Sequence, residues 1–274
     1  MFKSIIDYTK QTTPLVHAIT NYVTVNDCAN IILAAGGSPI MADDINEVEE
    51  ITSICNALAI NMGTLNKHTI EAMIAAGRQA NKLGHPVILD PVAAGASSWR
   101  NAGVKRLLEE VKFAVIRGNI SEIKAVYYGS GNPSGVDANA DDIVTRSNLM
   151  QTIELAKELS KKTGAVIAIS GEFDIVTDES KTYVIKNGHE TMTKVTGSGC
   201  MLTTVIATYC GAHYDHILDA TAAAVCSMGI SGEFAYNEMV KNNQGYSSFR
   251  MHMINHMSQL EGETVERGAK IEIY

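Results

Sequence analysis

The chain has 274 residues, 46% of them hydrophobic, and a formal net charge of −8. Its length and apolar content suffice for a large core in one big domain or two tightly joined ones, and only five prolines argue against a flexible linker. The acidic balance excludes nucleic acid as the expected partner, because phosphate backbones are bound by basic faces. We expect a single domain over residues 1–274.

Cysteine usage and the first residues predict the compartment. The five cysteines are odd in number and lack C-x-x-C spacing, which is typical of reduced thiols in a cytoplasmic protein. No signal-peptide pattern opens the chain, and no apolar run reaches the roughly 18 residues of a membrane helix. We therefore expect a soluble cytoplasmic protein with no membrane partner.

Short apolar runs alternate along the chain with longer helical patterns, which predicts βαβ units and a mostly parallel sheet covered on both faces. The expected strands are Leu15–Ile19, Ala57–Asn61, Pro86–Asp90, Phe113–Arg117 and Ala165–Ser170. The expected helices are Val25–Ala35, Glu47–Cys55, Lys67–Lys82, Val104–Glu110 and Asn148–Lys162. A hairpin over Asp174–Thr177 and Thr182–Lys186 follows, then mostly helix to Gln259 and an edge strand within Thr264–Tyr274.

Polar residues stand at the ends of several expected strands. Asp90 ends one strand, Arg117-Gly118-Asn119 ends the next, and Ser170-Gly171-Glu172 ends a third. In open α/β sheets the ligand crevice lies outside the carboxyl ends of the strands. These residues, distant in sequence, are therefore expected to meet at one rim.

The segment Val195-Thr196-Gly197-Ser198-Gly199-Cys200 runs into an apolar stretch that should be helical. A helix start offers unpaired N–H groups and a positive dipole end, which attract phosphate, and glycine allows close approach. A thiol at this place is favoured as the thiolate and can act as a base or nucleophile. The alternative interpretation is a glycine turn that merely begins a core helix.

Asn119 and Glu122 stand three residues apart at another expected helix start. One interpretation is a capping box, in which Asn119 caps the helix and Glu122 reaches back. The other interpretation is that these two residues, together with Asp90 and Arg117, form a site for Mg²⁺ and phosphates.

Five segments occur in an order that resembles the hydroxyethylthiazole kinase family, the thiamine-salvage branch of the ribokinase-like superfamily. They are His17-Ala18-Ile19-Thr20-Asn21-Tyr22-Val23-Thr24, Gly37-Ser38-Pro39-Ile40-Met41, Asp90-Pro91-Val92-Ala93, Arg117-Gly118-Asn119 with Glu122, and Val195–Cys200. The loop Gly129–Asp137 is similar to that family's glycine-rich segment, although Asn132-Pro133-Ser134 departs from its usual centre.

The resemblance implies a three-layer ribokinase-like fold, with ATP and hydroxyethylthiazole as ligands, Mg²⁺ as cofactor and a homotrimer that shares thiazole pockets between subunits. By position, it implies Cys200 as the catalytic residue, where most of the superfamily carries an aspartate base. It assigns thiazole contacts to Met41, Gly197 and Asn21, ATP contacts to Arg117, Ser170 and Asn119, and the metal region to Asp90 and Glu122.

Alternatives stay open at this point. A pyrimidine kinase or an NAD(P)H-hydrate dehydratase of the same superfamily would share many motifs, and a noncatalytic ligand sensor would bind without turnover. A Rossmann dehydrogenase fits less well, because the glycine-rich segment does not follow the first strand. We expect His252 and His256 to be exposed surface residues rather than metal ligands, and His17 to line the thiazole pocket or to be a hydrogen-bonded core residue.

Overall fold

The computed structural model describes residues 2–129 and 144–274. Within them, nine strands form one sheet in the order β2-β1-β3-β4-β5-β6-β7-β8-β9. Neighbours from β2 to β6 run parallel, and β7, β8 and β9 add antiparallel pairings at the other end. The strands are β1 (Leu15–Ile19), β2 (Ser38–Ile40), β3 (Ala57–Asn61), β4 (Val87–Asp90), β5 (Val115–Asn119), β6 (Val166–Ser170), β7 (Asp174–Thr177), β8 (Thr182–Ile185) and β9 (Ile271–Ile273).

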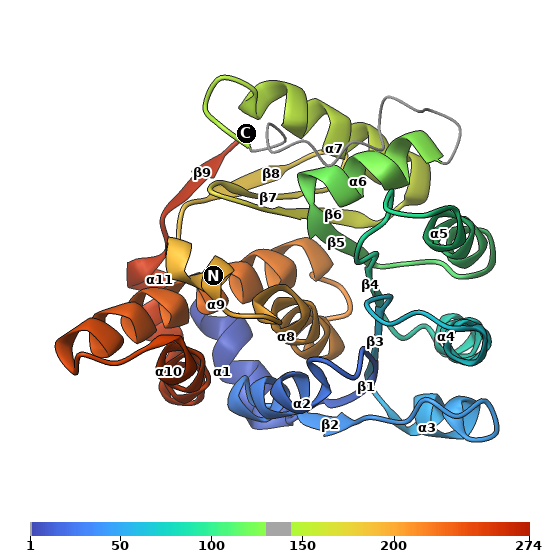
Figure 1. The fold of residues 1–274 in the computed structure, drawn as a ribbon, viewed down its shortest axis with the longest axis horizontal. Helices are drawn as coiled ribbons and strands as arrows, with labels where there is room; N and C mark the ends of the chain where they lie inside the picture. Colours follow the sequence, from blue (N-terminus) through green and yellow to red (C-terminus); the bar gives the residue numbers. More distant parts are fainter. Residues whose placement is uncertain (1, 130–143) are drawn as a thin grey trace.

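Helices cover both faces of this sheet (Figure 1). One face carries α3 (Val48–Ile54), α4 (Lys67–Leu83), α5 (Ser98–Glu110), α6 (Ile120–Tyr128) and α7 (Leu149–Thr163). The other carries α1 (Phe2–Thr12), α2 (Val25–Ala34), α8 (Ser198–Ala212) and α9 (Ile217–Lys241), with α10 (Tyr246–Gln259) and α11 (Gly262–Gly268) packed outside them. The predicted three-layer α/β arrangement is confirmed.

Two hydrophobic cores lie on the two faces of the sheet. Alternate residues of β3 illustrate why: Ala57 and Ala59 face the core under α8 and α9, whereas Leu58 and Ile60 face the core under α4 to α7. Small side chains on the first face let α8 approach the sheet closely, and every residue of β3 is buried. The continuous apolar strands predicted from the sequence thus lie between two helical layers.

The sequence did not predict helix α1, strand β2 or helix α11. Helix α1 buries Phe2, Ile5, Ile6 and Thr9, a helical spacing that the pattern did contain. Strand β2 has only three residues and includes Pro39, which lacks the N–H needed in a central strand. Because β2 lies at the edge of the sheet and pairs on one side only, a proline is tolerated there.

Some boundaries differ from the expectation. Helix α5 begins at Ser98, capped by the Ser97 hydroxyl, rather than at Val104. The expected last strand is confirmed only at Ile271–Ile273, because most of the earlier part of Thr264–Tyr274 belongs to α11. Most of the loop Gly129–Asp137 lies outside the described residues. No helix within the described ranges is long and apolar enough to cross a membrane.

The histidine predictions had mixed outcomes. His17 is fully buried and its ring nitrogens contact Thr52 Oγ1 at 2.8 Å and the Ala42 carbonyl at 2.9 Å, so it is a hydrogen-bonded core residue. The prediction that His252 is exposed was wrong, since its side chain is buried and its Nε2 lies 2.6 Å from Gln244 Oε1. A helix face that looks polar in sequence is here covered by the chain that precedes α10.

Candidate active site

The carboxyl ends of four adjacent strands carry polar side chains that meet at one rim. Asn61 ends β3 beside Asp90 at the end of β4, and Asn119 ends β5 beside Ser170 at the end of β6, each pair in register. Parallel pairing brings residues at equal register onto the same edge. The expected convergence of distant strand ends is therefore present in the fold.

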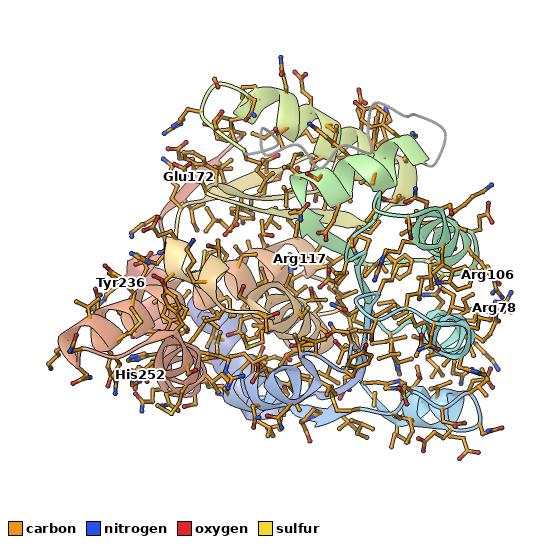
Figure 2. The ribbon with its side chains drawn as sticks, viewed as in Figure 1. Arg78, Arg106, Arg117, Glu172, Tyr236 and His252 are labelled. Atoms are coloured by element: carbon orange, nitrogen blue, oxygen red, sulfur yellow. The ribbon has the colours of Figure 1, made fainter. Side chains whose placement is uncertain are left out.

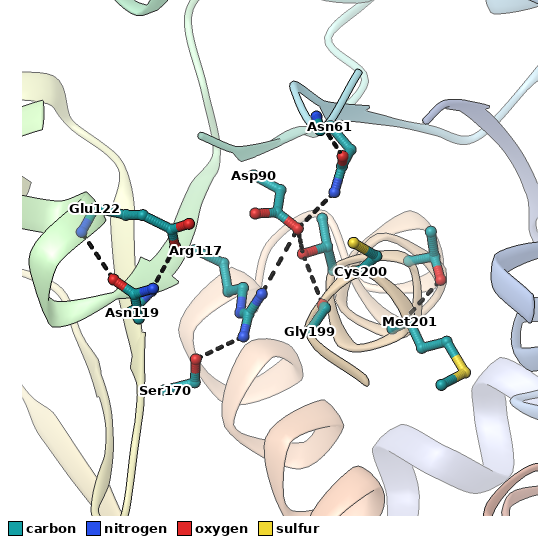
Figure 3. Close-up of polar contacts among 12 residues, drawn as sticks. Asn61, Asp90, Arg117, Asn119, Glu122, Ser170, Gly199, Cys200 and Met201 are labelled. Carbon is teal, nitrogen blue, oxygen red and sulfur yellow. Dashed lines mark hydrogen bonds and ion pairs between the residues drawn. The ribbon is translucent and has the colours of Figure 1, made fainter. Parts of the chain in front are cut away.

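Arg117 and Asp90 form a buried ion pair in the middle of this rim (Figure 3). Nη1 of Arg117 lies 3.6 Å from Oδ2 of Asp90, and its Nη2 donates to Ser170 Oγ at 2.5 Å. Burial raises the pKa of Asp90 to about 6, although the Arg117 charge lowers it. Among the described residues, Asp90 Oδ1 and Arg117 Nε are buried without hydrogen-bond partners. The pair therefore keeps polar capacity for a ligand.

Helix α8 begins beside that pair. Its first turn follows Gly197, whose φ of 89° is favoured only for glycine, and no side chain among the described residues caps it. A Cβ on Gly197 would lie 2.7 Å from Thr24 Cγ2, so the loop before α2 also requires glycine here. The unpaired N–H groups and dipole of this turn create the expected anion site.

Cys200 lies in the first turn of α8, and its thiol is partly exposed. Its Sγ accepts a hydrogen bond from Nδ2 of Asn21 at 3.3 Å. Cys28, Cys55, Cys210 and Cys226 are buried, and burial raises the pKa of each of those thiols. Of the five thiols, Cys200 is the one placed for chemistry.

Glu122 and Asn119 form the capping box that was one of the two interpretations. Glu122 Oε2 accepts from Asn119 N–H at 2.8 Å, and Asn119 Oδ1 accepts from Glu122 N–H at 2.8 Å. Oε1 of Glu122 also accepts from Ala93 N–H, which ties α6 to the loop after β4. Glu122 lies near enough to Asp90 to raise the pKa of that carboxyl.

The remaining predicted residue, Met41, lies apart from this network. It follows the edge strand β2 and packs partly buried against the core under α8 and α9. Strands β1 and β3 separate β2 from β4, which places about 14 Å of sheet between Met41 and Asp90. Within one subunit, the structure therefore does not bring Met41 together with the ion pair.

A cavity of about 690 Å³ opens beside Arg117, between the antiparallel strands and helices α8 and α9. Arg117, Ser170, Ser198 and Gly199 are among the residues that line it, as are Glu172 and His189. Figure 2 shows Arg117 near the middle of the molecule, with Glu172 and Tyr236 towards its periphery. The volume falls in the range of small-molecule and cofactor sites.

Sequence reasoning missed three polar residues here. Asp174 lines the cavity, and burial raises the pKa of its carboxyl to about 7. His189 also lines it and stacks on Tyr236 with ring centroids 3.5 Å apart. Asn61, at the end of β3, donates to Asp90 Oδ2 at 2.7 Å. A polar residue that ends a buried strand was a signal for Asn61, whereas nothing local marked the other two.

The two carboxylates suit a divalent cation that takes few protein ligands. Within the described residues, no three His, Cys, Asp or Glu side chains form a metal cluster. Mg²⁺ commonly uses one or two carboxylates, waters and substrate phosphates, so a third protein ligand is not needed. The buried oxygen Oδ1 of Asp90 has no partner, and a cation there would satisfy it.

The protein family follows from comparison with known sequences. The model of the hydroxyethylthiazole kinase family matches residues 6–263. This chain belongs to the hydroxyethylthiazole kinase family. A curated hydroxyethylthiazole kinase from Clostridium acetobutylicum is 56% identical over 274 residues, covering 100% of both chains. The resemblance inferred from the motifs is confirmed.

Solved structures agree with this membership. The structure of a hydroxyethylthiazole kinase protein from Pyrococcus horikoshii is similar with a TM-score of 0.87 and 30% identity, covering 100% of this chain and 98% of that one. A ribokinase-like superfamily protein from Enterococcus faecalis has a TM-score of 0.59 at 11% identity, covering 91% of this chain and 88% of that one. The second likeness shows the ribokinase-like fold.

Proposed function

We propose that this enzyme transfers the γ-phosphoryl group of ATP to the hydroxyl of 4-methyl-5-(2-hydroxyethyl)thiazole, a salvage step in thiamine formation. One observation carries the proposal: Cys200, the uncapped start of α8 and the Arg117–Asp90 pair stand together beside a cavity of nucleotide size. Family membership supports the choice of a thiazole alcohol as acceptor.

The geometry suits phosphoryl transfer. The reaction passes through a loose transition state, so positioning and charge stabilisation supply most of the acceleration. The N–H groups at the start of α8 and the Arg117 guanidinium would hold the transferring group, with Ser170 keeping Arg117 in place through its hydrogen bond. Cys200 would accept the proton of the alcohol. The alcohol needs to lose this proton only late in the transfer.

Asp90 and Glu122 would hold Mg²⁺, which neutralises phosphate charge when bound. Asp90 contributes a buried oxygen without a partner, and Glu122 contributes a carboxylate fixed by two backbone N–H groups. The remaining cation ligands would be waters and phosphate oxygens.

We further propose a homotrimer in the cytoplasm, with each thiazole pocket completed by a neighbouring subunit. Met41 and Gly197 would contact the thiazole directly, and Asn21 would act on the substrate through Cys200. The distance between Met41 and the ion pair within one subunit is consistent with a shared pocket. Tyr22 is 79% exposed beside Asn21, and a subunit interface would cover such a ring. A monomer in light scattering would contradict the shared pocket.

The decisive experiment is ADP formation from ATP with the purified thiazole alcohol, with and without Mg²⁺. We expect turnover that requires both the alcohol and the cation. The same assay with hydroxymethylpyrimidine and with hydrated NADH separates this function from its superfamily alternatives. Tight thiazole binding without ADP formation would identify a sensor and overturn the proposal.

A further inference from the structure

Two asparagines connect the thiol of Cys200 to the carboxylate of Asp90. Asn21 Nδ2 donates to Cys200 Sγ at 3.3 Å and to Asn61 Oδ1 at 2.9 Å. Asn61 Nδ2 in turn donates to Asp90 Oδ2 at 2.7 Å. The chain of contacts joins α8 to β4 through Asn21, in the loop between β1 and α2, and Asn61, at the end of β3.

The orientation of both amides is set by backbone groups that can only donate. Asn61 Oδ1 also accepts from Gly63 N–H at 2.9 Å, so its Nδ2 must face Asp90. Asn21 Oδ1 accepts from the N–H groups of Val23 and Thr24, each at 3.1 Å. Its Nδ2 must therefore face Asn61 and Cys200, because a flipped amide would place two donors against each other.

Burial makes these contacts obligatory. Asn21 is 4% exposed and Asn61 is 3% exposed, so neither amide can replace a lost partner with bulk water. The loop after β3 is also shaped for this contact. A Cβ on Gly63 would lie 2.7 Å from Asn21 Nδ2 and 2.8 Å from its Cγ, so only glycine leaves room for the amide.

We propose that Asn21, locked by Asn61, is a positioning residue for Cys200: it holds Sγ as a hydrogen-bond acceptor at a set place relative to Asp90. The donated hydrogen bond occupies one lone pair of Sγ and fixes the sulfur in place, which leaves its other lone pairs free to accept the alcohol proton. The pair thereby makes the proton acceptor and the cation-binding carboxylate one rigid unit. This role rests on the proposed function, although the thiol geometry can be tested without turnover.

The first variant is Asn21→Asp. It keeps an acceptor for Val23 and Thr24 but replaces the donor to Sγ by a carboxylate oxygen. The second is Gly63→Ala, which displaces the Asn21 amide without removing any polar group. Gly245→Ala is the matched control, because a Cβ there meets no atom within 4 Å and the φ of −103° suits alanine.

The primary measurement is the alkylation rate of Cys200 by iodoacetamide in the ligand-free protein, at one mildly alkaline pH, followed by peptide mass spectrometry. We expect both variants to react at least about threefold more slowly than the unmodified protein, since Sγ loses the hydrogen bond that holds and stabilises it as a nucleophile. Gly245→Ala should react at the unmodified rate. Thermal unfolding of each variant verifies that the fold persists.

Turnover separates positioning from substrate contact. A positioning role predicts that kcat falls about tenfold or more in both variants, while KM for the thiazole alcohol changes less than about threefold. Unchanged alkylation rates in Asn21→Asp and Gly63→Ala would overturn the inference whatever the activity. If the unmodified protein forms no ADP while the alkylation rates differ as expected, the proposed function fails and the positioning of the thiol stands.

Discussion

A Cβ on Gly199 would lie 2.6 Å from Nη1 of Arg117, so the guanidinium reaches Asp90 only because residue 199 has no side chain. This glycine in the first turn of α8 thus serves a second purpose besides access to a ligand. It lets the guanidinium of Arg117 lie directly against the first turn of the helix.

Gly199→Ala should therefore impair the enzyme without unfolding it. The new methyl group must push Arg117 away from Asp90 and Ser170, and misplacement on the ångström scale costs about 100-fold in rate. We expect kcat/KM for ATP to fall by about that factor, as measured by ADP release. Gly245→Ala serves as the control. Full activity of Gly199→Ala would show that catalysis does not depend on the position of Arg117 beside Asp90.

Replacement of Cys200 tests the proton acceptor. Cys200→Ala should lower kcat by a factor on the order of 10²–10⁴, the usual contribution of a general base, with substrate KM values nearly unchanged. Cys200→Asp should regain activity relative to Cys200→Ala, because a carboxylate can accept the same proton. Steady-state ADP release measures both, and unchanged turnover in Cys200→Ala would remove the thiol from the mechanism.

The stability of the metal-free protein should depend on the ionisation of Asp90. Burial raises the pKa of this carboxyl from 3.8 to about 6, so its contribution to stability is fully present below pH 3.8 and is lost as pH rises through about 6. Asp90→Asn has no such titration. Relative to the unmodified protein, the variant should gain up to about 3 kcal/mol of unfolding free energy between pH 4 and 7.

Urea unfolding at each pH, with a chelator present, measures this difference. Added Mg²⁺ should reduce it, because a bound cation favours the ionised carboxylate that the variant lacks. A difference that does not change with pH would contradict a buried carboxyl with a raised pKa.

Asp174 should make ATP binding depend on pH near neutrality. Burial raises the pKa of its carboxyl to about 7. The ionised form would repel the phosphates of ATP in the cavity beside Arg117, which Asp174 lines. We expect KM for ATP, relative to that of Asp174→Asn, to rise about threefold from pH 6 to 8. The amide keeps an acceptor for Gly171 N–H, so the turn persists. A constant ratio would show that Asp174 does not face the phosphates.

Local sequence patterns predicted most of the sheet. Continuous apolar runs such as Ala57–Asn61 are buried on both faces. Such a strand is stable only inside a sheet that helices cover on both sides. The rule that parallel strand ends share an edge then predicted that Asp90, Arg117 and Ser170 lie together. Strand β2 was harder to predict, because three residues around Pro39 carry too little periodicity.

The amino-acid sequence by itself determined the fold class, the family, and which strand ends and which helix start carry the chemistry, because these follow from short-range periodicity and from motifs contiguous in the chain. Only the tertiary structure decided that Asn21 and Asn61 link Cys200 to Asp90, that Gly199 makes room for Arg117, and that Asp174 faces the cavity. Those facts depend on side-chain directions and sub-ångström clearances between elements far apart in the chain, which no local pattern encodes.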